Sequence, residues 1–290
     1  MAWGVAAGLL CAFCWAVGSV SFRNIAHKLD PFSLNAPRTL AAGLLMLIML
    51  ALSGHMGEIA TIPPRNLFYL IISIAVTAAI GDAFYVTSIR KMGLSRTIPI
   101  ANAYPALTMG LAVLFLNETI TWTLAVGLVL VMIGVVLVSR PNGGTAADKG
   151  ELKAGLSYAL ITALFWAAGM VLTAPGMEGI GALAASAVRT PALSLMLWAV
   201  VLVRRSYRQY AALTRREWVI LIVGGLIGWG FGNLFFVAAV SLLGATRAAI
   251  LASTPPIFAL PLSTFWMHER PTWPVIVGTF IVVSGIILIS

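Results

Sequence analysis

The sequence predicts an all-α polytopic membrane protein with ten transmembrane helices, arranged as two inverted five-helix repeats. Three observations carry this prediction. The 290 residues are 60% apolar and only 9% charged, whereas a soluble domain has roughly a quarter charged residues. The charges stand in short gaps between apolar runs of roughly twenty residues, the length that one bilayer-spanning helix needs. The second half of the chain also repeats the first. This composition excludes a soluble enzyme, a nucleic-acid binder and a disordered tail.

The gaps between apolar runs define the expected helices in order. A linker rich in turn residues and charge occupies 140–151, at the middle of the chain. It separates a first repeat, 1–139, from a second, 152–290. The ten expected spans are 2–22, 32–53, 66–89, 93–116, 120–139, 152–173, 180–203, 217–240, 244–267 and 271–289.

The two halves align without a gap at an offset of 151 residues. Of the 139 aligned pairs, 33 are identical. Shared apolar bias does not readily produce the rarer matches, such as Trp15 with Trp166, Glu118 with Glu269 and Arg38 with Arg189. Because five spans per half is an odd number, the second copy must enter the membrane from the opposite side. Inverted repeats of this kind underlie many secondary transporters, whose binding site lies near the midplane where the halves meet.

Two stretches of each half resemble the EamA repeat of the drug/metabolite transporter superfamily. In the first half these are 93–97 (GLSRT) and 115–122 (FLNETITW), followed by Gly127 and Gly134. In the second half they are 244–249 (GATRAA) and 267–273 (MHERPTW), followed by Gly278 and Gly285. The resemblance covers the whole chain. It implies a ten-helix carrier that exports amino acids or related metabolites, with a central cavity lined by helices 1, 3, 4, 6, 8 and 9. Within the superfamily it leaves the substrate open.

Asp82 is the one carboxylate well inside an expected span. A charge at a helix centre costs roughly 2.5–3.5 kcal/mol on insertion scales, so such a residue usually faces a cavity or a partner. We expect Asp82 to bind a cationic group or a proton; the alternative is a structural, hydrogen-bonded carboxyl. Its equivalent in the second repeat is Asn233. Tyr85 follows Asp82 by one turn on the same helix face, and Phe236 is its equivalent.

Aromatic and polar residues near the middles of other spans complete the expected binding site. Trp15 and Trp166 lie away from the span ends, where an aromatic belt would place them. Ordinary packing is the alternative for each ring. The expected substrate-binding residues are Trp15, Ser19, Asp82, Tyr85, Asn102, Tyr104, Trp166, Asn233, Phe236 and Ser253. The expected hinge or gating residues are Gly81, Pro99, Pro105, Gly232, Pro255 and Pro256.

Other polar residues receive structural interpretations. Small residues four apart (Ser73, Thr77 and Gly81; Gly224, Gly228 and Gly232) predict close helix approach. Glu118 and Glu269 fit helix N-caps before the fifth and tenth spans. Arg38 and Arg189, two turns into their spans, fit snorkelling to the interface; the alternative is a gating or anion-attracting role.

The sequence favours a carrier over an enzyme. No cluster of His, Asp and Glu suits catalysis on a lipid-linked substrate, Cys11 and Cys14 lack further metal ligands, and no nucleotide-binding motif is present. We expect no cofactor, no metal and no nucleic-acid partner; the partners are a small-molecule substrate and the lipid bilayer. Efflux of hydrophobic cations is the alternative transport function, and the oligomeric state stays open.

The distribution of basic residues predicts the orientation in a cell inner membrane. The loops on one side hold 14 Lys and Arg, whereas the other side holds only Arg65 and Arg247. Because cytoplasmic loops carry the excess, both termini are expected on the non-cytoplasmic side.

Overall fold

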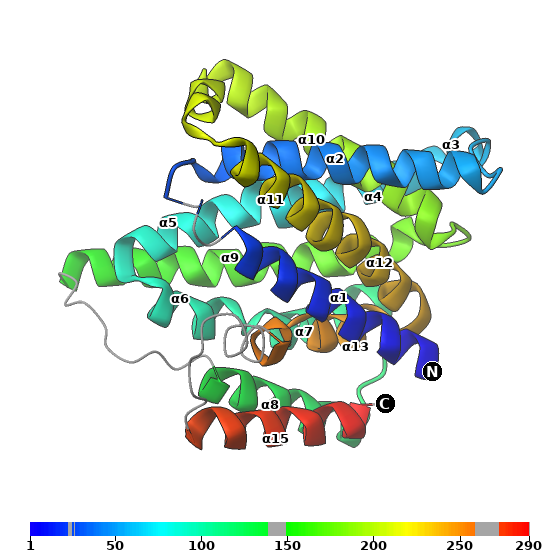
Figure 1. Cartoon of the computed structure of the whole chain (residues 1–290). Coiled ribbons are helices and arrows are strands. Elements are labelled where there is room, and N and C mark those ends of the chain that lie inside the picture. Colours follow the sequence, from blue (N-terminus) through cyan, green and yellow to red (C-terminus); the bar gives the residue numbers. More distant parts are fainter. Residues whose placement is uncertain (23–24, 26, 139–148, 259–272, 290) are drawn as a thin grey trace.

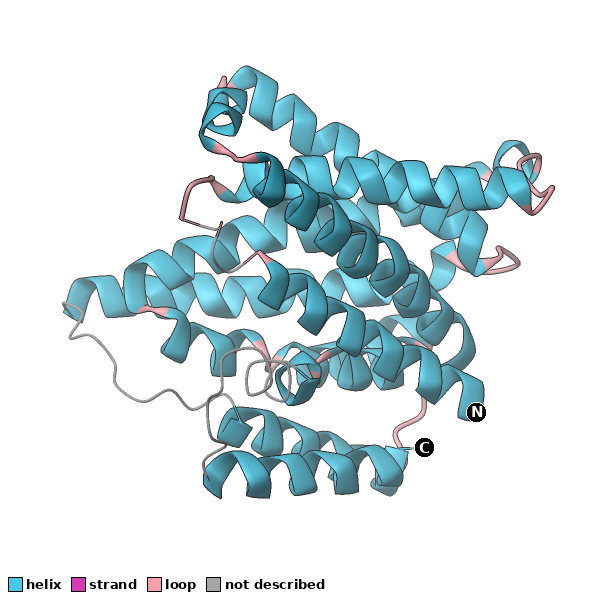
Figure 2. Cartoon of the chain, viewed as in Figure 1, coloured by secondary structure: helices cyan, strands magenta, loops and turns pink. Residues whose placement is uncertain are grey.

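The computed structural model describes residues 1–22, 25, 27–138, 149–258 and 273–289, and among these it contains helices joined by short loops and turns, without strands (Figure 2). Six helical stretches are long and apolar enough to cross a membrane. Three shorter apolar helices, Tyr104–Leu116, Trp122–Val138 and Ile276–Ile289, accompany them. The expected span at 244–267 lies partly outside the described residues, as does most of the expected linker at 140–151.

The first half follows the expected order of spans. It comprises α1 (Ala2–Ser21), α2 (Pro31–Leu52), the short α3 (Glu58–Thr61), the continuous stretch α4 (Pro64–Ile74), η1 (Ala75–Gly81) and α5 (Asp82–Met92), then α6 (Leu94–Ala101), α7 (Tyr104–Leu116) and α8 (Trp122–Val138).

The second half repeats this order. It comprises α9 (Lys149–Gly176), α10 (Ala182–Val203), the 3₁₀ helix η2 (Ser206–Ala212), the continuous stretch α11 (Arg215–Gly225), η3 (Leu226–Phe231) and α12 (Gly232–Leu243), then α13 (Ala245–Ala252) and α15 (Trp273–Ile289).

Equivalent helices of the two halves pack reciprocally. α1 lies against η3 and α12 of the second half, and its equivalent α9 lies against η1 and α5 of the first. α2 pairs with α10 and α8 pairs with α15 (Figure 1). Each of these helices thus makes the same contacts with the other half as its equivalent does.

Glycines allow the close approaches that the small-residue spacing predicts. A Cβ on Gly18 of α1 would lie 3.0 Å from the Cα of Gly228 in η3, so the two backbones are in contact. At the α8–α15 pair, Gly134 and Gly278 likewise face each other's carbonyl oxygens. Helices without side chains at the contact can bring their backbones together, which is a main source of helix association in lipid.

A π-helical segment interrupts the same span in each half. η1 ends at Gly81, directly before Asp82, and η3 ends at Phe231, directly before Gly232 and Asn233. A π-helix uses i→i+5 hydrogen bonds and is frequent at functional sites. The periodicity of the sequence does not predict either segment.

The fourth span of the first half, expected as one helix over 93–116, is broken into two. α6 ends at Ala101, and α7 begins at Tyr104 with Pro105 in its first turn. In the second half α13 ends at Ala252, directly before Ser253, which is the equivalent of Asn102. The breaks therefore occupy equivalent positions.

Candidate functional site

The centre of the candidate site is a hydrogen bond between the two halves. The indole N–H of Trp166, on α9, donates to Oδ1 of Asp82 at 3.0 Å. Asp82 begins α5, directly after the π-helical turn, and is partly exposed. The carboxylate therefore lies in the middle of a span and at the contact between the halves.

Aromatic rings surround this hydrogen bond. The ring of Tyr85 lies 5.1 Å from that of Trp166, and Tyr104 meets the same indole edge-on at 5.6 Å. The Tyr104 hydroxyl donates to the carbonyl of Ala249 on α13 at 3.1 Å, which ties α7 to the other half. No pattern in the sequence pairs Tyr104 with Trp166, because the two residues are far apart along the chain.

Arg38 contributes a positive charge near the carboxylate. Its guanidinium interacts electrostatically with Asp82, although no ion pair within 4.0 Å joins the two. Nη1 donates instead to Oδ1 of Asn35 at 2.7 Å, and the group lies 4.1 Å above the ring of Phe22. The site thus holds one carboxylate and one guanidinium that are not neutralised by direct contact.

The equivalent place in the second half is neutral at its centre. Nδ2 of Asn233 donates to Oγ1 of Thr190 at 2.9 Å, so the amide is held within its own half. Trp15 stacks on Phe236 with ring centroids 5.9 Å apart. Both tryptophans pack against the same buried cluster, which includes Phe236 and Tyr104.

Gly81 and Gly232 make room for the two tryptophans. A Cβ on Gly81 would lie 2.8 Å from Cδ1 of Trp166, and one on Gly232 would lie 2.6 Å from Cδ1 of Trp15. These glycines were expected at hinges, and the structure places each beside an indole of the opposite half. Glycine is therefore needed at both positions because a larger side chain would collide with an indole, and the sequence alone does not reveal this contact.

The remaining residues expected at the site either lie apart from the Asp82–Trp166 contact or form hydrogen bonds with their own neighbours in the chain. Ser19 is exposed on α1, and Asn102 is partly exposed at the break between α6 and α7. The Ser253 hydroxyl donates to the carbonyl of Ile250 in its own helix. Pro255 and Pro256 follow the second break and are partly exposed. The side chain of Pro99 lies outside the described part of the chain.

Two structural interpretations from the sequence need correction. Arg38 and Arg189 do not snorkel, because their side chains are buried, with exposed fractions of 5% and 1%. Glu118 does cap a helix, but that helix is α13 of the other half. Its carboxylate accepts from the N–H groups of Ala245 and Thr246 at 2.7 and 3.3 Å. The equivalent Glu269 lies outside the described residues.

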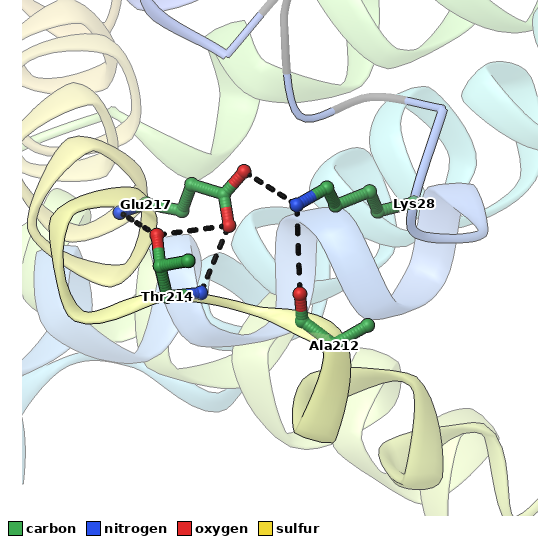
Figure 3. Close-up of polar contacts among 4 residues, drawn as sticks. All are labelled: Lys28, Ala212, Thr214 and Glu217. Atoms are coloured by element: carbon green, nitrogen blue, oxygen red, sulfur yellow. Dashed lines mark hydrogen bonds and ion pairs between the residues drawn. The ribbon is translucent and has the colours of Figure 1, made fainter.

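Polar contacts join the halves at both ends of the helices. At the end opposite the termini, Nζ of Lys28 contacts Oε1 of Glu217 at 2.7 Å. Glu217 also forms a capping box with Thr214, and Lys28 reaches the carbonyl of Ala212 at 3.5 Å (Figure 3).

At the end that carries the termini, the equivalent of Glu217 is Asn66. Its Nδ2 donates to backbone carbonyls at and just after the end of α9, the shortest contact being 2.9 Å to Glu178. One end is therefore linked by a short, partly exposed ion pair, and the other by the Asn66 amide together with a longer ion pair between Arg65 and Glu178, 3.8 Å apart.

The described residues contain no group of three or more His, Cys, Asp and Glu side chains that suits a metal ion. Cys11 and Cys14 are free and buried. Within the described ranges, the polar groups at the site centre are amide, carboxylate, hydroxyl, indole and guanidinium groups. Such a set binds a solute through hydrogen bonds and charge.

Comparison with known proteins agrees with this architecture. The chain is 23% identical over 281 residues to an uncharacterized transporter of Archaeoglobus fulgidus, covering 97% of this chain and 95% of that one. It is 22% identical over 224 residues to a putative sugar uptake protein of Bacillus cereus, covering 73% and 75%. A crystal structure shares the fold, with a TM-score of 0.81, 13% identity and coverage of 98% and 94%. The sequence model of the EamA-like transporter family matches residues 2–140 and again 153–290. The chain therefore belongs to the EamA-like transporter family.

Proposed function

We propose that this membrane transporter exports amino acids or related small metabolites, by alternating access around a binding site between its two halves. The observation that carries the proposal is the mid-span carboxylate of Asp82, which meets Trp166 across the contact between the halves. A carboxylate in this position favours a cationic group such as an ammonium. No coupling by ATP is invoked, since the sequence has no Walker motif.

The surroundings of Asp82 suit an ammonium. The rings of Tyr85 and Trp166 lie beside the carboxylate, and aromatic faces attract cations by about 0.5–2 kcal/mol. The Trp166 N–H occupies one carboxylate oxygen, which leaves acceptor capacity on the other. Proton uptake and release by the same carboxylate is the second version of this role.

The contacts at the two ends supply the elements of alternating access. Opening one end requires the Lys28–Glu217 pair to separate, and opening the other requires Asn66 to leave the carbonyls of α9. The Lys28–Glu217 pair is partly exposed to water, which screens its charges, so it can break at a moderate cost. In our proposal the halves rock about the Asp82–Trp166 contact as these links open in turn.

A sugar is the second candidate substrate. The putative sugar uptake proteins among the relatives suggest it, and the stacked Trp15 and Phe236 beside the neutral Asn233–Thr190 pair resemble the mixture of rings and amides that suits hydroxyl-rich ligands. Hydrophobic cations are the third class, because Asp82 and its rings also fit them.

Transport by purified full-length protein in proteoliposomes discriminates these classes. Vesicles loaded with an unlabelled amino acid, a sugar or tetraphenylphosphonium are diluted into a trace of the labelled compound. We expect counterflow with at least one amino acid and none with the sugars. Counterflow confined to sugars or to the lipophilic cation contradicts the proposal, as does a signal equal to that of empty vesicles.

We also propose an inner-membrane location with both termini on the non-cytoplasmic side. The excess of basic residues at the opposite end supports this orientation. A C-terminal alkaline phosphatase fusion is expected to be active in the periplasm of a bacterial host. An inactive phosphatase fusion together with a fluorescent GFP fusion overturns the orientation.

A further inference from the structure

Two arginines at equivalent positions lie buried between the halves. Arg38 is on α2 and Arg189 is on α10, and these helices pack against each other. The Arg189 side chain is only 1% exposed. Because a guanidinium stays protonated in proteins, both groups bring a positive charge into the helix bundle.

The two guanidinium groups differ in what balances their charge. The half that holds Arg38 has the carboxylate of Asp82 at its centre, although no ion pair within 4.0 Å joins the two. Arg189 has no such partner among the described residues: Nη1 donates to the neutral Oγ1 of Thr173 at 2.9 Å, and the group lies 5.3 Å from the ring of Phe236. The Nε atoms of both arginines are buried and lack a hydrogen-bond acceptor in the described structure, so the difference lies in the missing carboxylate beside Arg189.

A buried cation without a counter-charge is unstable relative to one that meets an anion. Removing a charge from water costs several kcal/mol unless another charge or hydrogen bonds compensate for it. The planar guanidinium offers paired N–H donors that match the two oxygens of a carboxylate. The surroundings of Arg189 therefore lack the group that this side chain binds best.

Arg189 also lies beside the predicted substrate-binding residues. Phe236, which its guanidinium contacts, stacks on Trp15 and lies one turn after Asn233. An anion held by Arg189 would thus touch the aromatic pair of the second half. In the first half the position equivalent to Asn233 holds the carboxylate of Asp82, so a negative charge is present there and absent beside Arg189.

We infer that Arg189 binds a carboxylate group of the transported molecule. This inference rests on the proposed transport function and narrows its substrate class to molecules that carry a carboxylate. The inferred carboxylate site at Arg189 belongs to the second half, whereas the proposed cation site at Asp82 belongs to the first.

The test compares ligands that differ only in the carboxylate. Binding to the purified full-length protein is measured by calorimetry with L-amino acids, their amides, their decarboxylated amines and the corresponding 2-hydroxy acids. The wild-type protein is expected to prefer acid over amide by about ten- to hundredfold, the worth of one or two charge-assisted hydrogen bonds. Equal affinity for acid and amide in the wild-type protein overturns the inference.

Variants then locate the preference. Arg189→Gln is expected to bring the acid-to-amide ratio close to one, whereas the control Arg65→Gln, at an exposed arginine, keeps the ratio. Arg189→Lys retains the charge but loses the paired donors, so the ratio should fall at least about threefold. An unchanged ratio in folded Arg189→Gln overturns the inference. If Arg189→Gln does not fold, an unchanged acid-to-amide ratio in Arg189→Lys overturns the inference instead.

The hydroxy acids separate this inference from the proposed function. Binding of hydroxy acids but not amino acids, lost in Arg189→Gln, supports the carboxylate site while it contradicts amino-acid export. If only amines and amides bind, and Arg189→Gln does not change their binding, the substrate is cationic and Arg189 has a structural role. That outcome overturns the inference about Arg189. Chloride at the same ionic strength serves as the control for a general anion effect.

Discussion

The two halves of the molecule hold the same framework around different chemistry. In each half a π-helical turn precedes the central polar residue, a glycine beside it receives a tryptophan from the other half, and an aromatic residue follows one turn later. The first half places Asp82 there and bonds it across to Trp166, whereas the second half places Asn233 there and bonds it within the half to Thr190. The repeat therefore supplies the geometry, and single substitutions supply the charge.

Removing the carboxylate from the first half, or moving it to the second, tests the difference between the halves most directly. Asp82→Asn is expected to abolish or decouple transport while folding is retained, because asparagine is what the equivalent position already holds. The measurements are counterflow in proteoliposomes, pH dependence of transport and thermal unfolding. The double variant Asp82→Asn with Asn233→Asp serves as the control that restores the charge on the other side.

If the identity of the half matters, the double variant stays inactive, because Asn233 is bonded to Thr190 and not to an indole of the other half. Unchanged rates and unchanged pH dependence in Asp82→Asn would instead show that the carboxylate is structural.

Alanine at the two equivalent glycines is expected to have the next largest effect. In Gly81→Ala the new Cβ would meet Cδ1 of Trp166 at 2.8 Å and displace the indole from Asp82. Overpacking of this kind usually costs about 1–3 kcal/mol. Gly232→Ala disturbs Trp15 to a similar degree, so both variants should unfold at lower temperature. Transport should fall further in Gly81→Ala; equal losses in the two variants would argue against a special role for the Asp82–Trp166 contact.

Phenylalanine at the two tryptophans isolates the hydrogen bond from the packing. Trp166→Phe removes the N–H that donates to Asp82, and a hydrogen bond to a charged group contributes about 1.5–3 kcal/mol. We expect at least about a tenfold loss in the rate of counterflow. Trp15→Phe is the matched control, because its ring stacks on Phe236 and no hydrogen bond from its indole is present in the described structure. A larger loss in Trp15→Phe than in Trp166→Phe would reverse the assignment of the two halves.

The smallest expected effect concerns the helix N-caps at Asp30 and its equivalent Gly181. Asp30 accepts hydrogen bonds from the backbone N–H groups of Phe32 and Ser33. Burial works against ionisation, but these bonds and that from the Ser33 hydroxyl outweigh it, so the pKa of Asp30 lies below its ordinary value. Asp30→Ala should cost about 1 kcal/mol, whereas Gly181→Ser should gain only a few tenths.

The pH dependence of this cap has a defined sign. A carboxyl whose folded-state pKa is lowered stabilises the protein above its unfolded pKa of about 3.9, and this stability is lost as the pH falls through the lower folded-state value. The difference in unfolding temperature between wild type and Asp30→Ala should therefore shrink at acidic pH. A constant difference between pH 7 and pH 3 would show that packing, and not the charge, accounts for it.

Much of this arrangement follows from the sequence because hydropathy and internal repetition are one-dimensional signals. Asp82 stands out by charge within an apolar run, and the gapless offset of 151 residues identifies Asn233 as its equivalent. The partner of each residue is a different matter. That Trp166 donates to Asp82, or that Glu118 caps α13 of the other half, depends on how the halves pack, which no spacing along the chain records.

The burial of Arg38 and Arg189 likewise could not be predicted from spacing along the chain. Their depth within the spans was compatible with snorkelling, which needs only a long side chain and a nearby interface. Arg38 is buried instead, because a glycine on the neighbouring helix α11 lets that helix come close. A Cβ on Gly225 would lie only 2.7 Å from the Cα of Arg38. The small residues were visible in the sequence, but nothing in it paired them with an arginine.

The two π-helical turns also bear on the history of the chain. A turn closed by i→i+5 bonds holds one residue more than an α-helical turn. Both copies carry such a turn at the same repeat position, η1 from Ala75 and η3 from Leu226, and the copies align without a gap. One added residue before the duplication accounts for both turns, whereas acquisition afterwards requires two matching events. The distorted turn is thus older than the two-copy protein, and a homologue with a single copy should contain it as well.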